Sequence, residues 1–306
     1  MRWLAYILTA GLFGLLHLLP DSVLYFLSDF LYLIIYRLLG YRKKVVFDNL
    51  ERALPELDSK ERKRVARKFY HHLCDLTMET SASHFYSDRR FLKKISFSNI
   101  EVLEELYKKG KQVIGVTAHY GNWEYTIAIG HHTKYRTMGS YKPLENPWFD
   151  KMIRNSRSRF GTLPVPMEKI ARTLLQHYKD NIPAVSIMVA DQRPSVKNTQ
   201  YWTKFMGQET AMHLGSEKLA RKVDAAVVFL KIRRPRRGHY EVECELICED
   251  PNSMEAHEIT KAHAGILEEL IREEPQYWLW SHQRWKHTPE KVQEIKERQK
   301  AAAKQA

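Results

Sequence analysis

Two uninterrupted apolar stretches open the chain, residues 3–19 (WLAYILTAGLFGLLHLL) and 23–39 (VLYFLSDFLYLIIYRLL). Pro20 and Asp21 lie between them, a helix stop followed by a capping residue. Each stretch has about 17 residues, against the roughly 20 needed to cross a bilayer, so one span, a shallow hairpin and two interfacial helices all fit. We therefore expect residues 1–40 to form membrane-associated anchor helices. The alternative is that both stretches are core helices of a soluble protein.

Charges inside and after these stretches refine the expectation. Asp29 and Arg37 argue against a simple lipid-exposed span, because a charge at the bilayer centre is costly. Arg42, Lys43 and Lys44 follow at once, and the positive-inside tendency holds such a cluster on the cytoplasmic side. A second apolar run and the lack of a small-residue cleavage site favour retention over a cleaved signal peptide.

An amphipathic pattern runs from residue 58 to 80. Asp58 and Glu61 have the spacing of a capping box, and apolar residues recur at helical spacing behind them. The polar face is rich in Lys and Arg between residues 60 and 68, which suits either an anionic membrane or solvent.

Helices then alternate with short apolar runs typical of strands buried on both faces. The predicted helices are 100–108, 170–178 and 211–222, and the predicted strands are 112–117 (QVIGVT), 183–189 and 225–230. Residues 231–246 alternate like a hairpin with a basic tip at 233–237, and 259–271 read as a late helix. The pattern predicts an α/β fold, a mixed central sheet covered by helices on both faces. We assign residues 41–288 to one catalytic domain and 289–306 to a charged tail, a frayed helix or disordered.

The composition of the chain limits the classes of partner that it is expected to bind. The formal charge is +13 and the pI about 9.5, so the surface attracts anions such as phospholipid headgroups, nucleic acid or an acidic carrier protein. Three cysteines, Cys74, Cys244 and Cys248, give no reason to expect a disulfide framework. The spacing of Cys244 and Cys248 lacks the second pair that completes a zinc site, so we predict no metal.

The candidate chemistry follows the strand at 112–117. His119 comes just after it, where open α/β sheets bind ligands, and Glu124 lies five residues on, beyond Gly121. An imidazole can take a proton from a hydroxyl, and a carboxylate can hold its other nitrogen. Asp191 and Gln192 follow a second buried strand and should line the same mouth. The competing interpretation is an ordinary helix start, with Glu124 favoured by the helix dipole.

Residues 118–124 (AHYGNWE) resemble the signature of the lipid A late acyltransferases, the lauroyl and myristoyl transferases that add secondary acyl chains to the lipid anchor of lipopolysaccharide. Other blocks resemble that family in the same order: Tyr141, Lys142, Pro143, Asn146, Pro147 and Arg154; Asp191 with Gln192; Phe205, Gly207 and Thr210; and residues 275–286 (PQYWLWSHQRWK). The likeness covers nearly all of residues 1–288.

The resemblance implies a fold like that of the glycerolipid acyltransferases, with His119 as general base and Glu124 as its partner. It implies substrate contacts by Asn122, Tyr141, Lys142, Asn146, Arg154, Asp191 and Gln192. It also implies a lipid A precursor as acceptor, acyl carrier protein as donor without another cofactor, and a position on the cytoplasmic face of the inner membrane among its phospholipids. The basic surface suits an acidic donor.

Some assignments stay open. The family more often has Arg where this chain has Lys142, which puts a point charge in place of a bidentate fork, and Lys142 and Arg154 fit phosphate contacts or solvated surface equally well. Trp278, Trp280 and Trp285 fit a membrane interface, although we favour the core. The alternatives are an acyltransferase acting on another lipid, such as a phosphatidylinositol mannoside, an aminolipid or a lysophospholipid, and a basic nucleic-acid or membrane binding protein. We expect no nucleic acid partner, because DNA binding leaves the apolar N-terminus unexplained.

Overall fold

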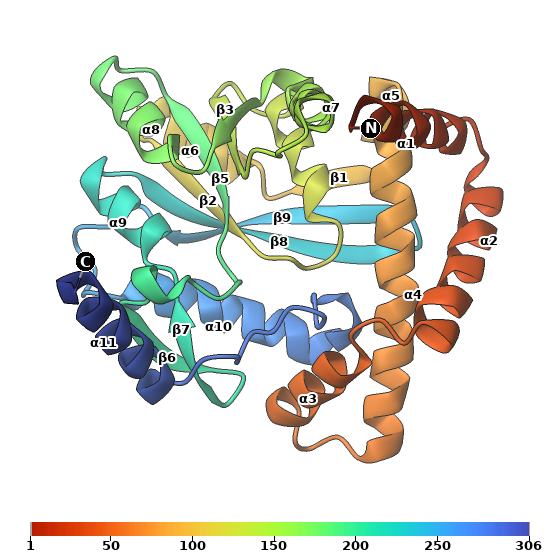
Figure 1. Ribbon diagram of the computed structural model, residues 1–306. Coiled ribbons are helices and arrows are strands. Elements are labelled where there is room, and N and C mark those ends of the chain that lie inside the picture. Colours follow the sequence, from red (N-terminus) through yellow and green to blue (C-terminus); the bar gives the residue numbers. More distant parts are fainter. Residues whose placement is uncertain (1, 306) are drawn as a thin grey trace.

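A seven-stranded sheet forms the centre of the molecule (Figure 1). The computed structural model describes the backbone of residues 2–305 and the side chains of residues 2–299. The strand order is β1-β9-β8-β2-β5-β3-β4. β2 pairs in parallel with both β5 and β8, β3 pairs in parallel with β5 and β4, and only the β8–β9 pair is antiparallel. The sheet is therefore mostly parallel.

The strands have the lengths that buried apolar runs predict. Every residue of β2 is buried, which accounts for its lack of alternation. The sheet strands are β1 (Ile95–Ser98), β2 (Val113–Thr117), β3 (Arg136–Tyr141), β4 (Leu163–Pro166), β5 (Ala184–Val189), β8 (Ala226–Arg236) and β9 (His239–Cys248). A separate hairpin consists of β6 (Tyr201–Phe205) and β7 (Gln208–Met212).

Helices flank the sheet, which confirms the mixed α/β class. They are α5 (Asp88–Leu92), α6 (Glu101–Lys108), α7 (Pro147–Arg157), α8 (Ile170–Lys179), α9 (Gly215–Lys222) and α10 (Glu258–Glu273). Short 3₁₀ turns cover Trp123–His131, Arg159–Gly161, Val196–Asn198 and Pro275–Tyr277. The C-terminal residues form α11 (Pro289–Gln305).

The long helix α4 (Ser59–Ser83) connects the N-terminal helices to the sheet (Figure 1). The predicted capping box is confirmed, because Asp58 accepts from the Glu61 amide and Glu61 accepts from the Asp58 amide. α2 (Asp21–Tyr32) packs along α4, and α3 (Lys43–Ala53) packs near its start.

The N-terminal helices direct many apolar side chains outward. α1 (Arg2–Leu16), α2 and the π-helical turn Leu33–Leu38 carry exposed large side chains at Trp3, Leu4, Ile7, Leu8, Leu12, Leu15, Val23, Phe26, Phe30, Leu33 and Leu38. Within residues 2–305, each helix taken singly is too short or too polar to cross a bilayer. Only Asp21–Leu38 joined with Lys43–Ala53, across a bend of 88°, has the length and apolarity required. The membrane-anchor assignment stays a prediction.

One sequence prediction needs correction. Residues 211 and 212 belong to strand β7 and not to the helix expected at 211–222, which begins at Gly215. The apolar residues Ala211 and Met212 fit the spacing of a helix as well as that of a strand. They form a strand because they pair with β6. The separate β6–β7 hairpin was not anticipated.

Candidate functional site

His119 is placed by a sharp turn at the carboxyl end of β2. Gly121 in this turn has φ +59°, and a Cβ atom there would come within 2.7 Å of the Ile232 side chain, so only glycine fits. The C-terminal segment pairs with the turn, since the Gly121 amide donates to the Tyr277 carbonyl and the Leu279 amide to the His119 carbonyl. The backbone on both sides of His119 is thereby fixed.

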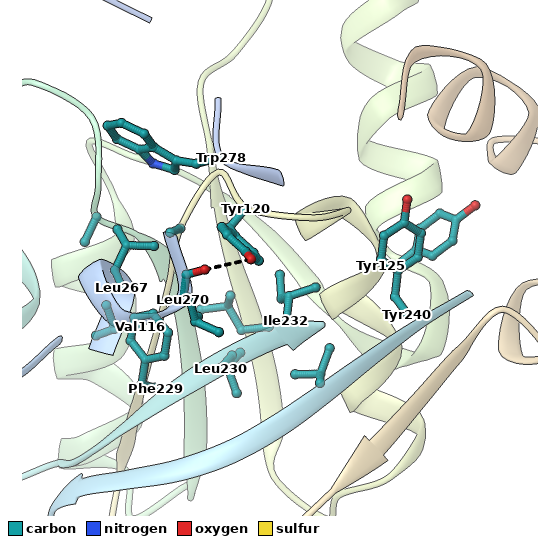
Figure 2. Close-up of a cluster of buried hydrophobic side chains, with 14 of the residues drawn as sticks. Val116, Tyr120, Tyr125, Phe229, Leu230, Ile232, Tyr240, Leu267, Leu270 and Trp278 are labelled. Atoms are coloured by element: carbon teal, nitrogen blue, oxygen red, sulfur yellow. Dashed lines mark hydrogen bonds between the residues drawn. The ribbon is translucent and has the colours of Figure 1, made fainter. Parts of the chain in front are cut away.

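A buried apolar cluster supports the turn from below (Figure 2). Tyr120 points into this cluster, and its hydroxyl donates to the Leu270 carbonyl of α10 at 3.0 Å. Trp278, which bridges Tyr120 in the backbone, is 2% exposed. Trp280 and Trp285 are also buried, so the preference for core positions is confirmed for all three tryptophans.

Asp191 holds the imidazole of His119. It follows β5, the parallel neighbour of β2, and its Oδ1 lies 2.7 Å from His119 Nδ1 and accepts from the His119 amide at 3.1 Å. Trp278 Nε1 donates to the other oxygen at 2.9 Å. The Asp191 side chain is only 3% exposed, so the carboxylate is fixed on both oxygens. The predicted proximity of Asp191 and His119 is confirmed.

The pair shifts both pKa values. Burial alone would lower the pKa of His119, but the charge and hydrogen bond of Asp191, aided by the charge of Glu124, raise it above the ordinary value. Burial would raise the pKa of Asp191, but the same contacts with His119 lower it to about 2. Asp191 is therefore a carboxylate throughout the physiological range, and it favours the Nδ1–H tautomer of the neutral imidazole.

The second ring nitrogen of His119, Nε2, is not held by Asp191. Gln192 Nε2 lies 3.1 Å from His119 Nε2 and can donate to it, and the indole of Trp123 packs edge-on against the ring at 4.7 Å between centroids. The His119 side chain is 19% exposed. This atom is where an incoming hydroxyl could deliver its proton.

Glu124 does not hold His119, contrary to the sequence prediction. Its carboxylate binds Arg157 of α7 in a bidentate pair, with Nη2–Oε1 at 2.6 Å and Nε–Oε2 at 3.1 Å. Glu124 lies in the 3₁₀ turn that follows the Gly121 bend, and this turn directs it to α7. Its charge still contributes to the raised pKa of His119.

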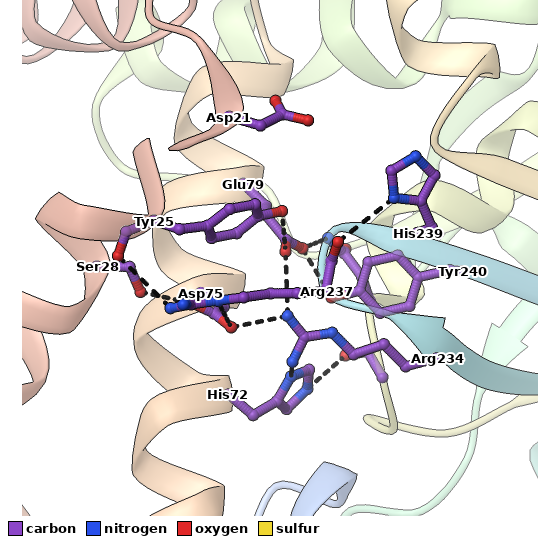
Figure 3. Close-up of polar contacts among 12 residues, drawn as sticks. Asp21, Tyr25, Ser28, His72, Asp75, Glu79, Arg234, Arg237, His239 and Tyr240 are labelled. Atoms are coloured by element: carbon purple, nitrogen blue, oxygen red, sulfur yellow. Dashed lines mark hydrogen bonds and ion pairs between the residues drawn. The ribbon is translucent and has the colours of Figure 1, made fainter. Parts of the chain in front are cut away.

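Asn122 is buried in the scaffold behind the turn, and a substrate contact by it stays a prediction. Its side chain is fully buried, and its Nδ2 donates to Glu79 of α4 at 3.0 Å. Glu79 also accepts from Tyr25 of α2 at 2.9 Å and Tyr240 of β9 at 2.7 Å. This buried carboxyl therefore connects the turn that carries His119 to α2, α4 and the sheet (Figure 3).

The predicted substrate-binding residues between positions 141 and 154 lie in different environments. Tyr141 is buried in β3, and Asn146 caps α7 by accepting from the Trp148 amide. Arg154 pairs with Asp150 one turn earlier, at 3.0 Å, and Arg157 on the same helix is the cation that reaches Glu124. Lys142 is exposed and has no ion pair among the described side chains. Substrate contacts by these residues stay predictions.

Arg157 and Trp278 are the neighbours that sequence reasoning missed. A glutamate after a tight turn needs a cation, but nothing along the chain distinguishes Arg157 from Arg154. Trp278 was noted only as a core aromatic, although its indole N–H completes the Asp191 site. Within residues 2–305, no group of three His, Cys, Asp or Glu side chains is arranged to hold a metal. The arrangement that remains is a histidine base oriented by a buried carboxylate.

Comparisons with known proteins give the family of the chain. Residues 1–287 match the family described as bacterial lipid A biosynthesis acyltransferase. The chain is 24% identical to the lipid A biosynthesis lauroyltransferase of Escherichia coli K12 over 296 residues, covering 95% of this chain and 94% of that protein. It is 22% identical to a lipid A biosynthesis acyltransferase of Haemophilus influenzae over 238 residues, covering 76% of this chain and 72% of that protein.

Proposed function

The chain belongs to the bacterial lipid A biosynthesis acyltransferases, and we propose that it transfers a fatty acyl group from acyl carrier protein to a hydroxyl of a lipid A precursor. The observation that carries the proposal is the His119–Asp191 pair, in which the carboxylate holds Nδ1 and leaves Nε2, beside Gln192, as the basic nitrogen. The arrangement needs no protein nucleophile, because the acceptor hydroxyl can attack the thioester directly.

In the proposed reaction, His119 Nε2 removes the proton of the acceptor hydroxyl as its oxygen attacks the acyl carbonyl carbon. The C–O bond forms, the C–S bond breaks, and the departing thiolate takes the proton back from the imidazolium. The products are an ester and the free thiol of the carrier. Asp191 keeps Nδ1–H pointed away from the substrate and stabilises the imidazolium that forms in between.

Glu124 has a supporting role in this proposal. Its charge favours the protonated ring, as the raised pKa of His119 indicates, and its bidentate bond orients Arg157 near the mouth. The predicted requirement for Glu124 is thus kept, with electrostatic support in place of a direct hydrogen bond.

Two surface properties support the proposed acyl donor and the proposed membrane contact. A formal charge of +13 favours an acidic carrier protein by steering the encounter. The outward apolar side chains of α1 and α2 suit the interface of the inner membrane, where the acceptor lipid resides. We therefore propose that these helices dock the enzyme on the cytoplasmic face.

The test is acyl transfer from radiolabelled acyl carrier protein to a lipid A precursor by the purified protein in detergent micelles. Product is expected with the native chain, and salt-dependent retention on DNA at the same protein concentration is expected to be weak. No transfer to this acceptor, with transfer to a lysophospholipid or an aminolipid, would assign the chain a different acceptor. Mass spectrometry of the product identifies the position acylated.

A further inference from the structure

A cavity opens on the other side of the turn that carries His119, between α2, α4 and the tip of the β8–β9 hairpin. Its volume is about 590 Å³. Figure 3 shows the polar side chains at its base, which come from all three elements. The charged and imidazole groups that matter for its chemistry are Lys68, His72, Asp75, Arg234, Arg236 and Arg237. His119 does not line it.

The base of the cavity is a fixed cation. The Arg234 side chain is only 8% exposed and donates to Asp75 at 2.7 Å. Its Nε is buried and has no acceptor among the described residues. Arg237 binds the same carboxylate at 2.6 Å, so one acid holds two guanidinium groups in place. A ligand entering here meets preorganised positive charge.

The charges around the cavity do not balance. Lysine and arginine contribute four cations to its wall, whereas Asp29 and Asp75 are its only carboxylates among the described residues. Lys68 and Arg236 at the rim have no ion pair within the described part of the chain. His72 adds no charge, because burial lowers its pKa to about 3. Behind the wall, buried Glu79 lies 3.6 Å from Arg234, so four cations face two lining carboxylates and this third acid. At least one positive charge is left over, which matches the single negative charge of a phosphodiester.

The position of the cavity indicates what bears the phosphate. Asp29 lines it from α2, and the neighbouring Phe26 and Phe30 on that helix are 71% and 58% exposed. Apolar surface beside a basic pocket suits a molecule with an anionic headgroup and hydrocarbon tails. The turn containing Gly121 separates this molecule from His119, since His72 on the cavity side contacts the Gly121 carbonyl at 3.2 Å.

We propose that this cavity binds the phosphate of an anionic membrane phospholipid that is not itself acylated. The inference rests on the proposed docking of α1 and α2 on the membrane. It assigns the hairpin tip a function, because Arg234, Arg236 and Arg237 all line the cavity beside α2.

The test compares binding of the full chain to phosphatidylglycerol-containing vesicles and to pure phosphatidylcholine vesicles. The double variant Lys68→Glu and Arg236→Glu reverses the two unpaired rim charges. The matched control, Lys179→Glu and Lys222→Glu, makes the same change in net charge on α8 and α9, which lie at the opposite side of the molecule (Figure 1). All four residues are exposed, and unchanged thermal unfolding verifies folding.

The rim variant is expected to lose roughly 30-fold in its binding to phosphatidylglycerol vesicles, because each basic residue near an anionic surface contributes about 1 kcal/mol. The control is expected to change less than about threefold, since charges far from the surface are screened. Equal losses in both variants, or no loss in the rim variant, would overturn the site. The binding measurement needs no acyl transfer, so its failure is separate from failure of the proposed enzyme.

Inorganic phosphate distinguishes a lipid from a soluble anion. At fixed ionic strength, phosphate is expected to compete only weakly with vesicles, because it lacks the tails that contact α2. Complete displacement of the native chain by millimolar phosphate would contradict a lipid ligand and assign the cavity to free phosphate.

Discussion

Two acid–base pairs flank the catalytic turn, and they differ in what surrounds them. The His119–Asp191 and Glu124–Arg157 contacts have similar lengths, 2.7 Å and 2.6 Å. Both carboxylates are bonded on both oxygens, but Asp191 is only 3% exposed, whereas Glu124 is 25% exposed and faces α7. A buried charge interacts far more strongly with its partner than one that water screens. Asp191, and not Glu124, is therefore expected to set the orientation and the pKa of the His119 ring.

The largest expected effect is that of His119→Ala. Removing the base should lower kcat by roughly 10³-fold, within the range typical of general base catalysis. Vesicle binding should stay close to that of the native chain, whereas thermal unfolding should move to lower temperature, because the buried Asp191 carboxylate loses its imidazole partner. Retention of more than a tenth of native kcat would contradict the proposed mechanism.

Asp191→Asn comes next, with a loss of roughly 10²-fold or more, because an amide no longer fixes the Nδ1–H tautomer. The pH dependence of kcat/KM gives this prediction a direction. Only the unprotonated ring is a base, so kcat/KM should fall as the pH drops through the raised pKa of His119. The variant lacks the anion that raises this pKa, so its acidic limb should move to lower pH. A limb that stays in place would show that Asp191 does not set the pKa of His119.

Glu124→Gln should have a smaller effect, roughly fivefold on kcat, equivalent to about 1 kcal/mol for a partly exposed pair. The control is Arg157→Gln, which breaks the same pair from its other side. A loss of 10²-fold or more for Glu124→Gln, with a small loss for Asp191→Asn, would reverse the ranking of the two pairs.

Lys142→Ala should have the smallest effect, a rise of a few fold in KM for the acceptor with little change in kcat, because an exposed lysine contributes binding and no chemistry. Lys169→Ala, at another exposed position, is the control. An unchanged KM would make Lys142 ordinary surface.

The sequence predicted which strand ends meet, because β2 and β5 are mostly apolar and parallel strands bring their carboxyl ends to one edge. It therefore brought His119, Asp191 and Gln192 together correctly. It assigned Glu124 instead of Asp191 to the imidazole of His119, because a separation of five residues does not determine where the Glu124 side chain points. The positive φ at Gly121 turns the chain, and the following 3₁₀ segment leads Glu124 to α7.

Asn122 shows a different limit of sequence reasoning. A residue inside a signature can be required for folding and not for substrate, and only its burial against Glu79 distinguishes the two. Glu79 itself has no mark in the sequence, since it lies on an amphipathic helix with many other acids and bases. Its three donors come from segments far apart in the chain, and such convergence follows only from the folded arrangement.

The pairing of Tyr120 with Trp278 has a consequence for how the enzyme comes into being. Trp278 follows His119 and Asp191 in the chain by more than 80 residues, yet it supplies the hydrogen bond to the second oxygen of Asp191. During synthesis the Asp191 carboxylate is therefore held on both oxygens only after Trp278 has been added.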